Sequence, residues 1–261
     1  MTVKFSPANT KLKKLYKVEA LKPYLANDRK IYSFDLLAGW ACPFANECKS
    51  QAIVYDSEEK QVKLTEPGFV YDSKKHHRKL RDGDNMKFRC FSASQEVIFT
   101  TAFNLRLRNF QAIKELKTSE QIYRALQAGL PANAGVVRLH VSGDFFKLDY
   151  MAAVIKLAKK NPHVLFYAYT KALPFWIQFR NTIDKTPNLV FTASVGGTYD
   201  HLINDYDLRS CTVVESEEQA KGAGLEIDHD DSHAADPSKK FARFGIVIHG
   251  MQKKGRLPII L

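Results

Sequence analysis

The chain has 261 residues, of which 45% are hydrophobic and 26% are charged. This is the composition of a globular protein, which excludes a disordered or fibrous chain. Lysine and arginine outnumber aspartate and glutamate by 39 to 28, so the formal net charge is +11. The chain has no apolar run of about 18 residues, which excludes a membrane-spanning helix. The N-terminal segment lacks the apolar core of a signal peptide, so we expect a protein of the reducing cytoplasm whose four cysteines form no disulfide.

The positive charge is confined to two segments. Residues 1–31 hold eight lysines and arginines against two acidic residues, a net +6, and residues 74–89 hold seven against two, a net +5. These two values account for the whole of the +11, so the rest of the chain is electrically balanced. Localised positive charge is typical of an anion-binding surface or of solvated arms.

The first part of the chain is rich in turns and short strands. Apolar and polar residues alternate, as in half-buried strands, over residues 30–37, 51–56 and 61–66. The sequence AGWACPFANECKS lies between the first two of these strands. Apolar residues at helical spacing then predict one helix over residues 94–116 and another from Ser119 to about residue 129.

Strands and helices alternate in the second part of the chain. Strands are expected at 136–141, 164–170, 189–195, 211–215 and 244–250, and helices from about 149 to 161, from 174 to 184 and from 216 to 221. This spacing is typical of parallel βαβ units with right-handed crossovers. We therefore expect an α/β fold with a partial or complete parallel βα barrel over residues 94–261. The basic, cysteine-bearing residues 1–93 are expected to pack on it as part of one compact unit.

The four cysteines are the sharpest chemical feature. Cys42 and Cys48 share one polar, turn-rich loop, Cys90 precedes the first long helix, and Cys211 opens a late strand. Thiolates are soft ligands that select zinc or iron–sulfur centres. The spacing matches neither the CxxC pairs of most zinc ribbons nor the CxxCxxC run of bacterial ferredoxins. Buried free thiols are the alternative without a metal. Because the loop offers little apolar burial, we favour a metal centre.

Five short motifs follow one another along the chain: AGWACPFANECKS, FRCFSASQEV, LHVSGDFF, FYAYTK and IVIHG. In this order they resemble the gene product 88 family of bacteriophages and related bacterial proteins. The resemblance covers about residues 33–252, which is most of the chain. Because the activity of that family is not known, the resemblance implies a phage protein without implying a function.

The second half of the chain is also similar to the βα barrel of radical S-adenosylmethionine enzymes. In those enzymes a motif related to Gly-Gly-Glu ends a strand and binds the amino group of the cofactor, and polar residues of later strands face it. The resemblance implies cofactor-binding residues at Ser142, Gly143, Asp144, Lys171, Ser194 and Gly196. A strand-to-helix turn capped by Asp144 is the alternative interpretation of the first three.

The cysteine spacing departs from that family, whose members carry CxxxCxxC in one loop. The resemblance still implies a [4Fe–4S] cluster with Cys42, Cys48 and Cys90 as its ligands, which leaves one iron open for substrate or cofactor. Cys211 is the candidate fourth ligand. If Cys211 binds, the cluster is closed and a radical mechanism fails.

The sequence is therefore compatible with three functions. We favour a cytoplasmic iron–sulfur protein in redox or radical chemistry on an unknown substrate, served by a redox partner. A zinc-stabilised binding module would use the same cysteines. A nucleic-acid-binding module would use residues 1–31 and 74–89 to contact phosphates, with aromatic neighbours such as Tyr16 and Phe88 stacking on bases. The acidic and histidine-rich residues 229–236 are expected to form a solvated loop rather than a metal site.

Overall fold

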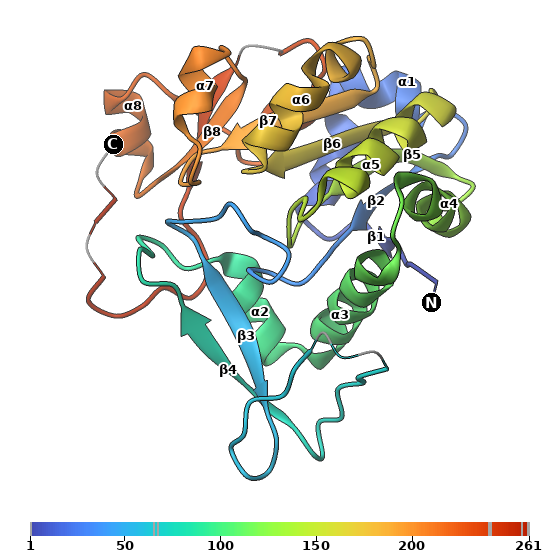
Figure 1. The fold of residues 1–261 in the computed structure, drawn as a ribbon. Helices are drawn as coiled ribbons and strands as arrows, with labels where there is room; N and C mark the ends of the chain where they lie inside the picture. The colour runs from blue at the N-terminus through green and yellow to red at the C-terminus, as the bar shows by residue number, and fades with distance from the viewer. Residues whose placement is uncertain (1, 65, 67, 240–241, 257, 260–261) are drawn as a thin grey trace.

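The computed structural model describes residues 2–64, 66, 68–239, 242–256 and 258–259. Its main feature is an eight-stranded sheet in the order β1-β2-β5-β6-β7-β8-β10-β9 (Figure 1). The strands are β1 (Ser6–Pro7), β2 (Lys30–Phe34), β5 (Ala134–Leu139), β6 (Leu165–Thr170), β7 (Leu189–Ser194), β8 (Ser210–Val214), β9 (Glu226–Ile227) and β10 (Arg243–Val247). Only β1 runs antiparallel to its neighbour, and the other described pairs are parallel. The predicted α/β class with a parallel sheet is confirmed.

Strands β2, β5, β6, β7 and β8 lie side by side in the order in which the chain makes them. Successive right-handed crossovers in one direction place the connecting helices on one face of a sheet. The helices of this part are α4 (Ser119–Gly129), α5 (Leu148–Lys160), α6 (Leu173–Asp184), α7 (His201–Asp205) and α8 (Glu217–Gly222). Figure 1 shows α5 and α6 beside each other over the sheet. This strand order is that of a barrel, but over the described residues the sheet is open, with β1 and β9 at its edges.

The opposite face of the sheet is covered by the N-terminal segment and by a short helix near the C-terminus. The N-terminal elements are the 3₁₀ helices η1 (Leu12–Lys17) and η2 (Glu19–Leu21) and helix α1 (Lys22–Leu25), and the later helix is α9 (Ser232–Ala235). Leu12, Leu15 and Leu21 are fully buried against side chains of this face such as Tyr167. These side chains therefore fill one part of this face of the sheet, which we call the inner face, and another part of it is left hollow.

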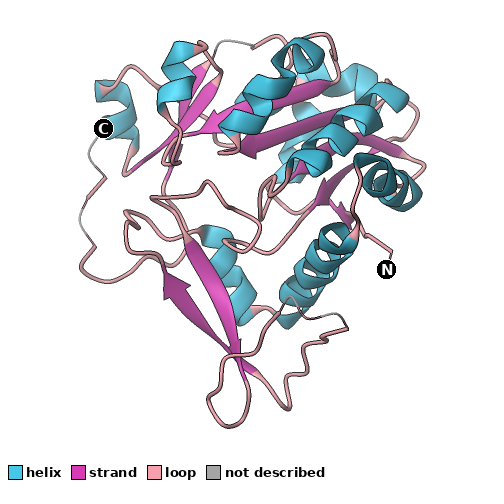
Figure 2. Ribbon diagram, in the orientation of Figure 1, coloured by secondary structure: helices cyan, strands magenta, loops and turns pink. Residues whose placement is uncertain are grey.

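A second, two-stranded sheet stands apart from the first (Figure 2). It pairs β3 (Ser50–Tyr55) with β4 (His77–Asp82) antiparallel, with Ser50 opposite Asp82 and Tyr55 opposite His77. Helices α2 (Phe91–Ile98) and α3 (Thr100–Glu115) follow, and α2 packs on this sheet. No strand was expected at β4, because its sequence HRKLRD is mostly charged.

Two sequence predictions for this region are wrong in part. The strand expected at residues 61–66 is reduced to a single bridge between Gln61 and Tyr55, and its other described residues are not in a strand, while residue 65 lies outside the described residues. The single helix expected over 94–116 is two helices, because Phe99 takes an extended conformation with φ −103° and ψ 104°. Two β-branched residues, Thr100 and Thr101, follow at the break and weaken helix propensity there.

None of the helices in the described part of the chain is both long and apolar enough to cross a membrane.

Candidate functional site

The loop that carries Cys42 and Cys48 crosses the carboxyl end of strand β7. The backbone N–H groups of Asn46 and Glu47 donate to the Gly196 carbonyl at 3.2 and 2.9 Å. Gly196 has φ +97°, a conformation that favours glycine, and a Cβ there would lie 3.2 Å from Glu47 Cβ. The loop is thus fastened to the point where a parallel strand of the main sheet ends.

The segment before Cys90 is fastened to the same loop. The Glu47 carbonyl accepts hydrogen bonds from the N–H groups of Lys87 and Phe88 at 2.8 and 3.1 Å. Cys48 directly follows the accepting residue, and Cys90 comes two residues after the second donor. These two bonds therefore bring together cysteines that lie far apart in the sequence.

Cys42, Cys48 and Cys90 form one electrostatic group. Burial raises the pKa of Cys90 to about 11, and the charge of Cys48 adds to this effect. Burial also raises the pKa of Cys42, as do the Asp144 carboxylate and then the other two cysteines. An ionised thiol disfavours ionisation of another thiol, which is the effect that Cys48 has on Cys90 and that both have on Cys42. Among the described residues, however, no three His, Cys, Asp or Glu side chains are placed to hold a single metal ion.

Cys211 is placed differently. It is buried on β8, where burial raises its pKa. The charged groups that act most strongly on it are Lys171, Asp228, Lys11 and Asp231. The main electrostatic partners of the predicted fourth ligand therefore differ from those of Cys42 and Cys90.

Cys48, Cys90 and Cys211 all line one cavity of about 680 Å³. It lies over the sheet near the carboxyl ends of the strands, and Arg138 of β5 and Tyr169 of β6 also form part of its wall. Functional groups of parallel βα folds gather at the carboxyl ends of the strands, and this cavity opens there. Its volume is within the range of about 300–1,000 Å³ that is typical of small-molecule sites.

The Ser142-Gly143-Asp144 turn forms the end of β5. Gly143 has φ +84°, and a Cβ there would lie 2.6 Å from Leu36 Cβ, so the close approach of the segment that follows β2 requires glycine. Asp144 Oδ1 accepts from Thr170 Oγ1 at 2.6 Å, and Oδ2 accepts from the Lys171 N–H at 2.8 Å. Burial raises the pKa of Asp144 to about 6. Its carboxylate joins the ends of β5 and β6. The predicted turn is present, but Asp144 is not the cap of the helix that follows, because the N-cap of α5 is Lys147.

Ser142 leads to a residue that the sequence analysis missed. Its Oγ donates to Glu96 Oε1 at 2.9 Å, and the Ala38 N–H and Arg106 Nη1 donate to the same oxygen at 2.9 and 3.2 Å. Glu96 is fully buried, and burial raises its pKa to about 7. Its Oε2 has no partner within the described residues. The signal available in the sequence was a glutamate six residues after Cys90, within the helix predicted over residues 94–116.

Lys171 and Ser194 line the same cavity as Cys48 and Cys90. The Lys171 ammonium donates to Ser194 O, Ser194 Oγ and Val195 O at 2.8, 2.6 and 2.8 Å. Of the six predicted cofactor-binding residues, these two are therefore at the cavity wall. The other four, Ser142, Gly143, Asp144 and Gly196, build the turns that hold the wall in place.

A family model described as Gene product 88 matches residues 1–258, which is nearly the whole chain. The chain belongs to the gene product 88 family. No curated protein and no solved structure matches it. The resemblance to this phage family is thus confirmed, whereas the resemblance to the radical S-adenosylmethionine barrel stays a prediction.

The floor of the cavity in this gene product 88 chain is an ionic cluster around Asp231. This fully buried carboxylate contacts Lys11 Nζ at 2.8 Å and Arg138 Nη1, and accepts from the Tyr167 hydroxyl at 3.1 Å. Burial would raise the pKa of Asp231, but the two cations lower it. The prediction of a solvated loop over 229–236 is wrong for Asp231, because the two cations offset the cost of burying it.

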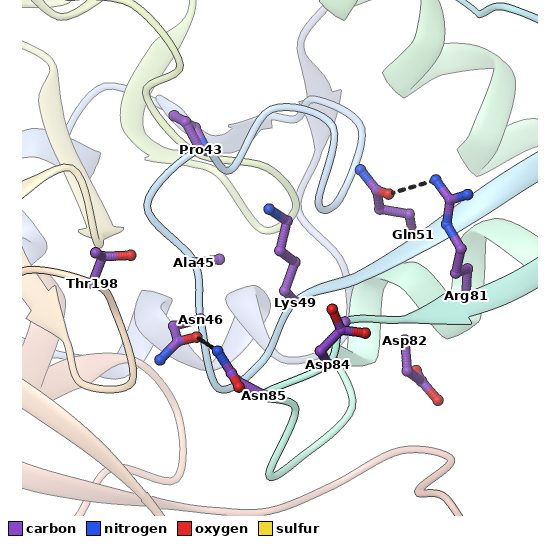
Figure 3. A pocket seen from close by; sticks show the side chains of 11 residues that line it. Pro43, Ala45, Asn46, Lys49, Gln51, Arg81, Asp82, Asp84, Asn85 and Thr198 are labelled. Carbon is purple, nitrogen blue, oxygen red and sulfur yellow. Dashed lines mark hydrogen bonds between the residues drawn. The ribbon is translucent and has the colours of Figure 1, made fainter.

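The outer side of the cysteine loop faces a second, polar hollow of about 430 Å³ (Figure 3). Lys49 and Asp84 line it, and Asn85 Nδ2 donates to Asn46 Oδ1 at 3.0 Å across it. Residues 42–48 therefore form a thin wall with a hollow on each side, and Cys48 and Cys90 belong to the inner one.

Proposed function

We propose that Cys42, Cys48 and Cys90 hold a [4Fe–4S] cluster that serves redox or radical chemistry on a ligand in the inner cavity. One observation carries the proposal: backbone hydrogen bonds fasten the segment before Cys90 to the loop that holds Cys42 and Cys48, and Cys48 and Cys90 line the same ligand-sized cavity at the strand ends. Sulfur ligands are those that iron–sulfur clusters use.

The number and placement of the thiols favour a cluster over a single zinc ion. A structural zinc ion takes four ligands, and thiolate sulfurs about 2.3 Å from one metal lie within about 4 Å of one another. Within the described residues no three candidate ligands are gathered around one point. A cluster holds its ligands further apart than a single ion does, since each sulfur binds a different iron. Three ligands would leave the fourth iron open.

S-adenosylmethionine is the second component in the enzyme form of this proposal. Its position beside the cluster is supported by Lys171 and Ser194, which line the cavity together with Cys48 and Cys90. Ser142 and Asp144 donate or accept hydrogen bonds within the protein, so their part would be to position the wall. An unchanged spin-resonance spectrum of the reduced cluster on addition of S-adenosylmethionine would remove this component and leave the cluster itself standing.

Metal analysis of protein purified without air tests the proposal. We expect a brown protein with iron and acid-labile sulfide in equal amounts, about four of each per chain. A colourless protein that takes up no iron on reconstitution would refute it. Stoichiometric zinc in protein from cells supplied with iron would replace it by the zinc-stabilised module.

A further inference from the structure

The two basic segments of the sequence meet at the mouth of the inner cavity. Residues 9–11 of the first segment and residues 88–89 of the second both line it. These segments hold all of the net charge, and nothing in their sequence spacing indicated that they would lie together. The cavity that contains Cys48 and Cys90 is thus entered between two basic segments.

On one side of the mouth, three lysines form a row. Residues three apart on a 3₁₀ helix lie on the same edge, with a rise of about 2 Å per residue. Lys11, Lys14 and Lys17 have this spacing along η1, whose Leu12 and Leu15 are buried. Lys11 reaches Asp231 at the cavity floor, while Lys14 and Lys17 are exposed and have no ion-pair partner in the described part of the chain. The row therefore leads outward from the cavity, and the charge of Lys14 also lowers the pKa of Asp230.

On the other side, the C-terminal segment adds charge to that of Arg89. The Arg89 N–H donates to Gln252 Oε1 at 2.8 Å, and Gln252 Nε2 donates to the Arg89 carbonyl at 3.3 Å. This pair of bonds holds Lys253 and Lys254 next to Arg89, and both lysine side chains are exposed. Arg89 itself donates from Nε to Asp82 Oδ1 at 3.0 Å and from Nη2 to Asp82 Oδ2, so its charge is offset. The cations that a negatively charged chain would meet on this side are therefore Lys253 and Lys254.

Aromatic rings stand at the same entrance. Phe91 and His249 line the cavity with their ring centroids 4.5 Å apart, and Phe91 is 37% exposed. Phe88 and Tyr169 line it as well. Exposed rings beside lysines are the combination by which proteins bind single-stranded nucleic acids, since bases stack on the rings while phosphates contact the cations.

We propose that the ligand of this cavity is a single-stranded nucleic acid. Its backbone crosses the mouth between the Lys11–Lys14–Lys17 row and the pair formed by Lys253 and Lys254, and one base enters past Phe91 toward Cys90. A duplex does not fit this geometry, because a base reaches an enclosed site only after leaving its stack. The inference rests on the proposed function only for the chemistry performed on the base, since the binding itself needs no cluster.

The test is fluorescence anisotropy with a labelled oligothymidylate, measured over a range of salt concentrations with iron-free and iron-loaded protein. The double variant Lys14→Glu/Lys17→Glu should bind at least about tenfold more weakly, and the slope of log K against log salt should fall by about 1.4, which corresponds to two lost phosphate contacts. The control Lys159→Glu/Lys160→Glu changes the charge equally on exposed residues at the end of α5 and should bind like the wild type.

Base entry is tested separately with Phe91→Ala. The wild type should prefer a base-bearing strand to an abasic strand of equal length, and the variant should lose this preference while it keeps its salt dependence. Absence of binding at low salt, equal effects of the two lysine pairs, or equal affinity for duplex would each overturn the inference. Iron-loaded protein without strand binding leaves the cluster proposal intact, and strand binding by protein that never takes up iron leaves this inference intact.

Discussion

Replacing Asp231 by asparagine tests the ionic floor of the cavity. The carboxylate is fully buried and is shared by Lys11, Arg138 and Tyr167. Its backbone has φ 67°, a left-handed conformation that asparagine adopts readily, so the substitution changes the charge without straining the chain. Removing one partner of a buried ion pair costs about 3–5 kcal/mol. Because Lys11 is about one-third exposed, we discount its share and expect the free energy of unfolding to fall by about 3 kcal/mol.

The same variant should alter the pH dependence of stability. The two cations hold the pKa of Asp231 in the folded protein below its ordinary value. A lowered folded-state pKa contributes stability above the unfolded pKa of about 4, and that stability is lost as the pH falls through the folded value. The wild type should therefore lose stability on acidification more steeply than Asp231→Asn does.

Urea denaturation at pH 7 and at pH values from about 5 downward measures both effects. Asp205→Asn is the matched control, since it removes an equal charge from an exposed position at the end of α7. A loss of less than about 1 kcal/mol at pH 7, together with unchanged pH dependence, would show that the carboxylate does not hold these cations in the folded protein.

Three further substitutions test the framework of the site. Gly143→Ala should lower the free energy of unfolding by about 1–3 kcal/mol, because φ +84° is strained for alanine and the new Cβ meets Leu36. In Gly222→Ala the added Cβ meets nothing, and stability equal to the wild type in thermal unfolding is expected there, whereas equal losses at both glycines would contradict the argument. Lys171→Met leaves the end of β7 without its three charged hydrogen bonds and should cost about 2–3 kcal/mol, and an unchanged urea midpoint would show that the ammonium holds nothing. Leu15→Ala should lower the free energy of unfolding by about 2–5 kcal/mol and speed proteolysis of the N-terminal segment. Unchanged stability and proteolysis would show that this segment is not packed on the sheet.

The parallel sheet could be predicted because its strands are buried on both faces and their apolar runs are visible in the sequence. The predicted strand at 164–170 and the observed β6 (Leu165–Thr170) differ by one residue. Strand β4 could not be found in this way, since pairing with β3 rather than apolar alternation defines it. Arg78 of β4 lies over the Tyr71 ring at 4.4 Å, so even its inward side chain is charged.

The candidate site, like the fold, could be predicted from the sequence only in part. Cysteine is chemically distinctive, so Cys42, Cys48 and Cys90 stand out in any sequence. Their convergence depends on hydrogen bonds from Lys87 and Phe88 to the Glu47 carbonyl, and backbone bonds of this kind leave no sequence pattern. Burial of Glu96 and Asp231 was missed for a related reason. From the sequence alone, a single acidic residue is expected to be exposed, because the cations and N–H groups that compensate a buried carboxylate become visible only in the structure.

The division between the three clustered cysteines and Cys211 is the central claim, and the iron content of single cysteine variants tests it most directly. Cys42→Ala, Cys48→Ala and Cys90→Ala, each reconstituted without air, should lose most of the iron and the visible absorbance of the wild type. Cys211→Ala should keep both, because Cys42, Cys48 and Cys90 are the proposed ligands and the main electrostatic partners of Cys211 are other charged side chains. Equal iron in all four variants, or loss of the cluster in Cys211→Ala while the protein stays folded, would contradict the account.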